Sequence, residues 1–370
     1  MGSFRFTMIP LVFFPAVILA VLAGGAWPAL AVTAVVLIHL VGDNVLPKDR
    51  RIGGHTATAL LDGLLFLHIP MTLTLLLALV WQASSGDLFG LGVMVNRWLG
   101  FELARHHAGI GTLVTAALAT GFMLSTNTIV GHELVHRTRT PWVVEIGRFL
   151  LMMIGDAQFA IAHVFGHHLN VGTLRDPATA RRGESLYTFI FRSGWGQIRE
   201  AAQLEHARLR RLGRNPVSLE NRFLIGSIGS LGFAALAFAL AGGTGLAAYF
   251  GAVAYSKFLF ETVNYIQHYG LVRAPGTPVQ PRHSWDCTNR VCSTAFYHLP
   301  RHSAHHAEAN IPFWDLEPKH DAMDMSKGYI AAMCLAMVPP LWKRIVGQQL
   351  TRWDAEMASP VERTLVPVSR

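Results

Sequence analysis

Six long apolar stretches constrain this chain more strongly than any other feature of its sequence. They lie at roughly residues 8–26, 27–43, 57–82, 109–131, 222–241 and 244–266. A helix needs about 20 mostly apolar residues to cross the hydrocarbon core of a bilayer, where only segments that satisfy their own backbone hydrogen bonds are stable. We therefore expect an all-α integral membrane protein with six transmembrane helices.

The balance of apolar and charged residues agrees with a membrane protein. Of the 370 residues, 51% are hydrophobic and 15% are charged, whereas a soluble domain carries about 25% charged residues. No proline- or serine-rich linker, low-complexity stretch or internal repeat divides the sequence, so residues 1–370 are expected to form one domain. The first stretch lacks a cleavage-site pattern and is expected to remain as an anchor.

The positions of lysine and arginine predict the orientation in the membrane. These residues gather near the N-terminus, after the second stretch, throughout 137–221 and in the C-terminal tail. Cytoplasmic loops collect such residues, so we expect both termini in the cytoplasm of a bacterial-type inner membrane. The regions 137–221 and 269–370 are too long to be connectors and are expected to form a cytoplasmic cap. The same rule accounts for the net charge of +8, and no nucleic-acid recognition motif is present.

Three cysteines, Cys287, Cys292 and Cys334, are too few for a disulfide framework. Cys287 and Cys292 could share a metal, but two thiols alone cannot close a zinc site. We interpret all three as free thiols in a reducing compartment.

Nine of the eighteen histidines fall into four compact groups. The groups are His132 and His136; His163, His167 and His168; His268; and His302, His305 and His306. Spacings of three and four let one helical turn direct several imidazoles to one point, and all four groups fall at the cytoplasmic side of the predicted spans. Neutral imidazole is a ligand for iron, copper and zinc. Nine ligands exceed what one ion can bind, so two metal ions are expected.

Some histidines also allow other interpretations, either as part of a zinc protease motif or as structural residues. The string from His132 to His136 matches the helix of zinc metalloproteases, with Glu133 as general base, but a protease would leave seven clustered histidines unexplained. His39 and His68 stand alone in apolar helices, and we interpret both as structural.

Four histidine motifs and their surroundings resemble the membrane-bound alkane 1-monooxygenases and the related xylene monooxygenase hydroxylase subunits. The motifs are Gly131-His132-Glu133-Leu134-Val135-His136-Arg137, His163-Val164-Phe165-Gly166-His167-His168, Asn264-Tyr265-Ile266-Gln267-His268-Tyr269-Gly270 and Leu299-Pro300-Arg301-His302-Ser303-Ala304-His305-His306. The resemblance implies six spans with a cytoplasmic cap, and two non-haem iron ions bound by the nine histidines. It also implies that one oxygen atom from O2 enters the terminal methyl C–H bond of a hydrocarbon, either an n-alkane or an alkylbenzene.

Three positions depart from the alkane enzymes of this family. Those enzymes usually have acidic residues where this chain has Ala162, Gln267 and Ala304. The first two substitutions resemble the xylene branch, whereas the surroundings of Arg301 resemble the alkane branch. None removes a histidine, so they bear on the substrate rather than on the metals.

The remaining expectations concern Glu133 and the partners. Glu133 is a candidate for orienting a ligand or relaying a proton, unless it only pairs with Arg137 one turn later. Substrate is expected to enter from the bilayer. The sequence has no flavin, nicotinamide or iron–sulfur motif, so electrons must come from another protein, by resemblance a rubredoxin or a ferredoxin-type reductase. The arginine-rich stretch 208–214 could dock such an acidic protein or lie on anionic lipid headgroups.

Two rival functions remain at the level of sequence. A membrane fatty-acid desaturase or lipid hydroxylase also uses histidine motifs, although the contexts of His268 and His302 favour the hydrocarbon enzymes. A non-catalytic metal carrier would place its ligands along a path through the bilayer, whereas these histidines are expected at one cytoplasmic level.

Overall fold

A computed structural model of the chain describes residues 3–366 apart from 52, 54–56, 107–108 and 326, and the described chain is mostly helical with almost no strand. The α-helices are α1 Phe14–Ala23, α2 Trp27–Val45, α3 Thr58–Phe66, α4 His68–Ala83, α5 Leu91–Leu99, α6 Ile110–Val135, α7 Pro141–Met153, α8 Phe159–Ala162, α9 His168–Asn170, α10 Leu186–Arg211, α11 Arg222–His268, α12 Arg290–Ala295, α13 His302–Ala307, α14 Tyr329–Ala336, α15 Pro339–Glu356 and α16 Pro360–Leu365. Short 3-10 turns cover Ser3–Thr7, Leu88–Gly90, Pro281–His283 and Phe313–Asp315, and π-helical turns cover Met8–Phe13 and His163–His167. Strands β1 (Trp285–Asp286) and β2 (Met323–Asp324) form a small parallel sheet.

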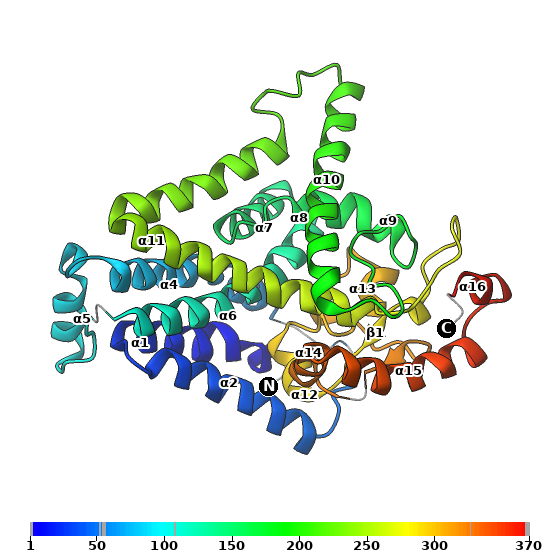
Figure 1. Cartoon of the computed structure of the whole chain (residues 1–370), viewed down its shortest axis with the longest axis horizontal. Coiled ribbons are helices and arrows are strands. Elements are labelled where there is room, and N and C mark those ends of the chain that lie inside the picture. Colours follow the sequence, from blue (N-terminus) through cyan, green and yellow to red (C-terminus); the bar gives the residue numbers. More distant parts are fainter. Residues whose placement is uncertain (1–2, 52, 54–56, 107–108, 326, 367–370) are drawn as a thin grey trace.

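Among the described residues, five helical segments are long and apolar enough to cross a membrane. They are Phe4–Ala23, Trp27–Val45, Thr58–Ala83, Ile110–Val135 and Arg222–His268. The last is α11, whose 47 residues are interrupted by non-helical backbone at Ala241 and Gly242. At Gly242 φ is +60°, a conformation that glycine adopts without steric cost, and the ribbon of α11 bends back sharply there (Figure 1). The stretches 222–241 and 244–266 therefore lie on the two sides of one bend.

The apolar helices pack side by side into a bundle around α6. Helices α1, α2, α4 and α6 run in a similar direction in Figure 1, together with the second half of α11. α6 packs against all four of these neighbours and against α7, and one continuous cluster of buried apolar side chains runs between them. This arrangement delivers the C-terminal ends of α6 and α11, with His132 and His268, to the same end of the bundle.

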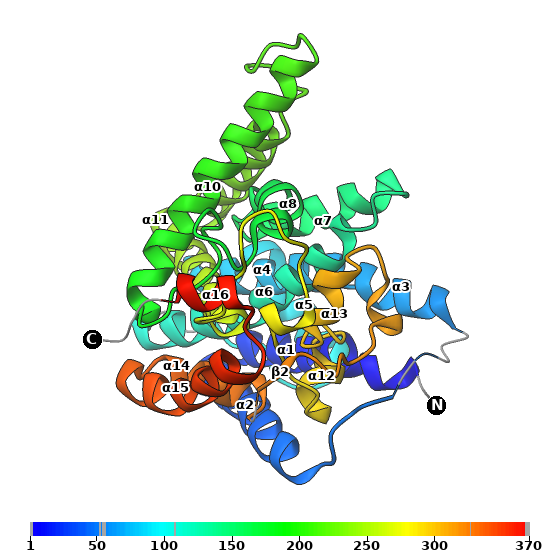
Figure 2. The ribbon, with the colours of Figure 1, turned by 90° about the vertical axis from the view of Figure 1, so that its right-hand side faces the viewer.

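The segments between and after these helices form a layer over that end of the bundle. It contains α8, α9, α12, α13 and the β1–β2 pair, with α14 to α16 beside them (Figure 2). α10 begins in this layer and then rises, with the first half of α11, into an arm that projects away from the rest in both views (Figures 1 and 2). We call residues 203–230 the arm.

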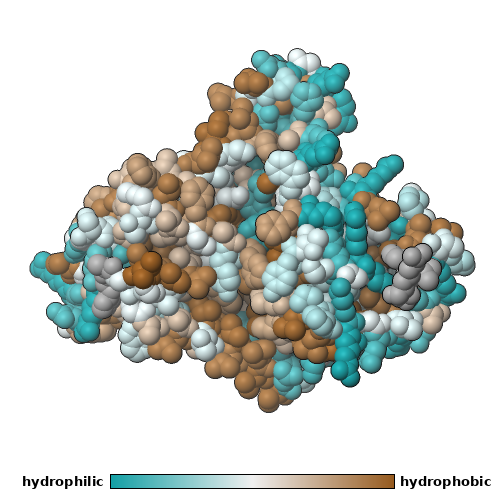
Figure 3. Space-filling view, in the orientation of Figure 1, coloured by the Kyte–Doolittle hydropathy of each residue, from teal (hydrophilic) through white to brown (hydrophobic). Residues whose placement is uncertain are grey.

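The surface agrees with a bundle that lies in lipid. Hydrophobic residues cover much of the bundle, and hydrophilic residues gather at the tip of the arm and over the end layer (Figure 3). Large apolar side chains such as Leu30, Leu37 and Val114 are exposed on the bundle helices. Exposed apolar surface of this extent is uncommon in soluble proteins, so these helices are typical of a multi-pass membrane protein.

Two glycines at the contact between α6 and α11 make a matched test of this packing. A Cβ atom at Gly121 would lie 2.5 Å from the backbone oxygen of Ala252, whereas one at Gly251 would lie 3.8 Å from Ala117. Small residues allow such close approach between membrane helices. We expect Gly121→Ala to destabilise the protein by about 1–3 kcal/mol because the helices must move apart.

Gly251→Ala should change stability by less than about 0.5 kcal/mol, since its Cβ meets only ordinary van der Waals contact. Thermal unfolding of both variants in detergent measures the difference. Equal melting temperatures for the two variants would contradict the packing described here.

Candidate metal centre

The nine histidines of the four sequence motifs converge into two adjacent groups. The first group holds His132, His136, His163, His168 and His305, and the second holds His167, His268, His302 and His306. Within each group the possible ligand atoms all lie within 4.8 Å of one another. Four separate parts of the fold contribute to this convergence: the end of α6, the segment 163–168, the end of α11, and α13.

Local helix geometry decides which histidine joins which group. His163–His167 is a π-helical turn, in which the backbone N–H of His168 bonds to the carbonyl of His163. The wider turn of a π-helix aligns residues five apart, so His163 and His168 share the first group while His167 enters the second. In α13 the spacing of four places His302 and His306 in the second group and leaves His305 for the first.

The distances between ring nitrogens are those of ligands around a common ion. In the first group the Nε2 atom of His305 lies 2.7 Å from that of His132 and 3.0 Å from that of His168. In the second, the Nε2 atom of His302 lies 2.9 Å from that of His268 and 3.1 Å from that of His306. Two nitrogens that each lie about 2.1 Å from a metal at right angles are about 3 Å apart.

Burial prepares these imidazoles to bind cations. Desolvation and the neighbouring imidazoles lower the pKa values of His136, His163 and His302 well below the ordinary value, and desolvation lowers that of His305 to about 3. The rings are therefore neutral near pH 7, which is the form that binds metal. The Nε2 atom of His136 is buried without a hydrogen-bond partner. Buried polar atoms normally have a partner, and a metal ion would provide one for this nitrogen. The residues fit two divalent metal ions.

Hydrogen bonds from outside the two groups hold several of the rings in place. The Nδ1 atom of His167 lies 2.8 Å from the Asp176 carboxylate, which also accepts from the Thr179 hydroxyl at 2.6 Å. Nδ1 of His268 lies 3.3 Å from the carbonyl oxygen of His283. Such partners fix the ring orientation and the nitrogen that is free for metal.

Asp286 supports α13 in a similar way. Its carboxylate accepts from the backbone N–H of Ser303 at 2.7 Å and from the Ser303 hydroxyl at 2.6 Å, which fixes the start of α13 beside His302. Sequence reasoning assigned no role to Asp176 or Asp286. The string Asp176-Pro177-Ala178-Thr179-Ala180 also resembles the family, and this resemblance is a sequence signal for Asp176.

The side chain of Glu133 contacts residues other than the nine histidines. Its Oε1 atom accepts from Arg137 at 2.9 Å and from the backbone N–H of Phe313 at 3.3 Å, and Arg137 also pairs with Asp62. The contacts thus include the Arg137 pair that the sequence offered as the alternative. They tie the end of α6 to the segment that follows α13.

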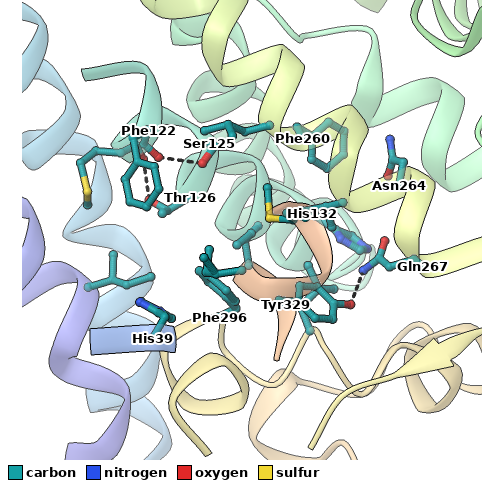
Figure 4. A pocket seen from close by; sticks show the side chains of 18 of the residues that line it. His39, Phe122, Ser125, Thr126, His132, Phe260, Asn264, Gln267, Phe296 and Tyr329 are labelled. Carbon is teal, nitrogen blue, oxygen red and sulfur yellow. Dashed lines mark hydrogen bonds between the residues drawn. The ribbon is translucent and has the colours of Figure 1, made fainter. Parts of the chain in front are cut away.

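An apolar cavity lies directly beside the metal-binding groups (Figure 4). His132, His163 and His302 line it on one side, and its free volume is about 50 Å³. Its aromatic walls come from Phe13, Phe122, Phe159, Phe260, Phe296 and Tyr329.

Few polar atoms of the cavity wall are free. The hydroxyls of Ser125 and Thr126 bond to carbonyls of their own helix, and Gln267, one of the departures from the alkane enzymes, donates to the Tyr329 hydroxyl at 2.9 Å (Figure 4). The cavity therefore suits a small hydrophobic molecule held against the histidines.

The other histidines and the cysteines singled out in the sequence lie outside the two groups. His68 is fully buried and pairs with Asn127 and Tyr297, as a structural histidine should. His39 bonds to the carbonyl of Val35 and lines the far part of the cavity. Cys287, Cys292 and Cys334 are free, as predicted.

Comparison with known proteins identifies the class and then the family. The model of the fatty acid desaturase family matches residues 108–333, so a multi-pass helical protein with histidine-rich metal sites is the class that fold and sequence define. The hydroxylase component XylM of xylene/toluene monooxygenase from Pseudomonas putida is 29% identical over 99% of this chain and 94% of the relative. Alkane 1-monooxygenases from Ectopseudomonas oleovorans and Pseudomonas aeruginosa are 30% and 31% identical over 78% and 74% of this chain, and over 68% and 77% of their own lengths. The chain belongs to the family of membrane-bound alkane and xylene monooxygenases, as its motifs predicted.

The hydrogen bond from His167 to Asp176 gives a test of the centre. In Asp176→Ala the ring of His167 loses the partner that orients it, so metal affinity should fall by about 10- to 100-fold. Asp321→Ala removes an exposed carboxylate and should leave affinity unchanged. Metal content after dialysis against graded chelator measures both variants, and equal retention would show that Asp176 does not support a metal ligand.

Proposed function

We propose that this protein is a non-haem di-iron monooxygenase that hydroxylates the terminal methyl group of a hydrocarbon. The observation that carries the proposal is the division of nine histidines, eight of them buried, into two adjacent groups of ligand atoms, with an apolar cavity beside both. His132, His136, His163, His168 and His305 would hold one iron. His167, His268, His302 and His306 would hold the other.

The overall reaction sets what the chain must provide. One oxygen atom of O2 enters a C–H bond, the other leaves as water, and two electrons and two protons are consumed. Two iron ions bound by the histidines would supply the activation of O2, since cofactors carry such chemistry while the protein orients and shields it. The chain holds the metals, presents the methyl group through the cavity and keeps water from it with aromatic walls. Glu133 would position the end of α6, which bears His132 and His136.

The lining of the cavity favours an aromatic substrate. Six aromatic side chains form its walls beside the histidines. Aromatic rings also pack well against one another at the edge-to-face and offset geometries that such walls offer. We therefore place an alkylbenzene first and an n-alkane second.

The topology proposed for the chain is six spans in one domain, 1–370, in a bacterial-type inner membrane. The bend at Ala241 and Gly242 supports counting α11 as two spans. Both termini, the cap formed by 137–221 and 269–370, and the metal centre would lie on the cytoplasmic side, where the arginine-rich segments are expected. The electron donor would be a rubredoxin or a ferredoxin-type reductase.

Product analysis with the purified protein tests the proposed function. With a reductase system we expect about two irons per chain, 4-methylbenzyl alcohol from p-xylene and, more slowly, 1-octanol from octane. His136→Ala should abolish product because it removes an iron ligand. His206→Ala changes an exposed histidine of α10 and should leave turnover intact.

Each rival has its own outcome in this experiment. Zinc in place of iron, or no hydroxylated product from either substrate, would overturn the proposal. A new double bond in an added fatty acyl chain would indicate the desaturase, and ready loss of metal on dialysis would indicate the carrier.

A further inference from the structure

The proposed function requires that electrons reach the irons from another protein, and the inference drawn here rests on that function. A donor must approach the protein surface where the metal ligands lie closest to it. Of the nine histidines only His168 is partly exposed. Two chain segments lie near that surface, one that follows His168 and one that follows His268.

A groove lies where these two segments of chain emerge. Its volume is about 590 Å³, and its walls come from 169–182 and 270–277, with Leu365 at one edge. Asp176, whose carboxylate holds His167, forms part of the floor, and Gly270 follows His268 by two residues. The chain segments that form its walls lie near α16, whose Leu365 also lines the groove (Figure 2).

Four arginines and one carboxylate line the groove. Arg273 is buried and ties the walls together through the carbonyls of Val171 and Leu169, and Arg182 forms a bidentate pair with Asp354. Arg175 and Arg181 are exposed, and within the described part of the chain neither guanidinium forms an ion pair. Arg175 and Arg181 therefore give the groove positive charge that no ion pair among the described residues neutralises.

Apolar side chains stand beside these charges. Leu169 is 72% exposed and Leu174 is 84% exposed, and both line the groove. An apolar centre with a charged rim is the usual composition of a transient protein interface. Charges on the rim steer a partner of opposite sign and set its orientation.

The second arginine-rich segment, 208–214, lies elsewhere. Its residues occupy the end of α10 and the tip of the arm, which projects away from the end layer in both views (Figures 1 and 2). Arg208 and Arg214 there are already paired with Glu205 and Glu220. A donor bound at the tip would be separated from the ligands by the length of the arm.

We propose that the groove formed by 169–182 and 270–277 is the docking surface for a small acidic electron-transfer protein, with Arg175 and Arg181 as its two recognition charges. Docking there places the donor against the residues that directly follow His168 and His268. The arm arginines then face anionic lipid headgroups instead.

Matched charge reversals in the full-length protein test this assignment. A rubredoxin with an acidic surface, kept reduced by NADH and its flavoprotein reductase, serves as the probe. R175E/R181E should raise the Kd and the KM for rubredoxin about tenfold at low salt and remove most of their salt dependence, because rim charges act mainly through steering. The control R210E/R211E reverses two exposed charges on the arm and should leave both constants unchanged.

Two further readouts separate docking from chemistry. Single-turnover yield with dithionite and methyl viologen should be the same in all three proteins, since this small reductant needs no docking surface. Rubredoxin binding, measured by microscale thermophoresis, does not depend on turnover at all. Unchanged binding in R175E/R181E, or an equal loss in R210E/R211E, would overturn the docking proposal. Absence of alcohol from the unmodified protein with viologen would instead overturn the proposed function.

Discussion

The gathering of nine largely buried imidazoles around two points is the constraint on which the rest of this structure depends. Buried ring nitrogens about 3 Å apart need polar partners, and protonating any of them would place a charge among its neighbours. Two divalent cations would satisfy both requirements. Asp176, His283 and Asp286 help to hold His167, His268 and the start of α13 in place.

The membrane bundle and the layer at its end each contribute histidines to the two groups. α6 and α11 carry His132 and His268 on rigid, buried helices, whereas the π-helical turn His163–His167 and α13 bring the other ligands from the end layer. The cavity opens where the two parts meet, among side chains of both. Under the proposed function, a hydrophobic substrate would occupy this cavity, and the electron donor would dock at the groove formed by 169–182 and 270–277.

The apolar stretches and the histidine motifs correctly predicted a helical membrane fold, the family and the convergence of the four histidine motifs. The division of the nine histidines into two groups could not be predicted from the sequence, because it depends on the π-helical turn His163–His167. Regular α-helical spacing would have placed His163 and His167 in the same group. The sequence also could not show that Glu133 contacts Phe313, or that 208–214 ends on an arm away from the ligands. These features depend on contacts between residues far apart in the chain.

Mössbauer spectroscopy of protein loaded with the Mössbauer-active iron isotope tests the central claim most directly. Sites with five and four imidazoles impose different ligand fields, so we expect two quadrupole doublets of equal area. A single doublet from one bound iron, or an absence of iron signal with zinc in its place, would contradict the division of the nine histidines into two iron sites.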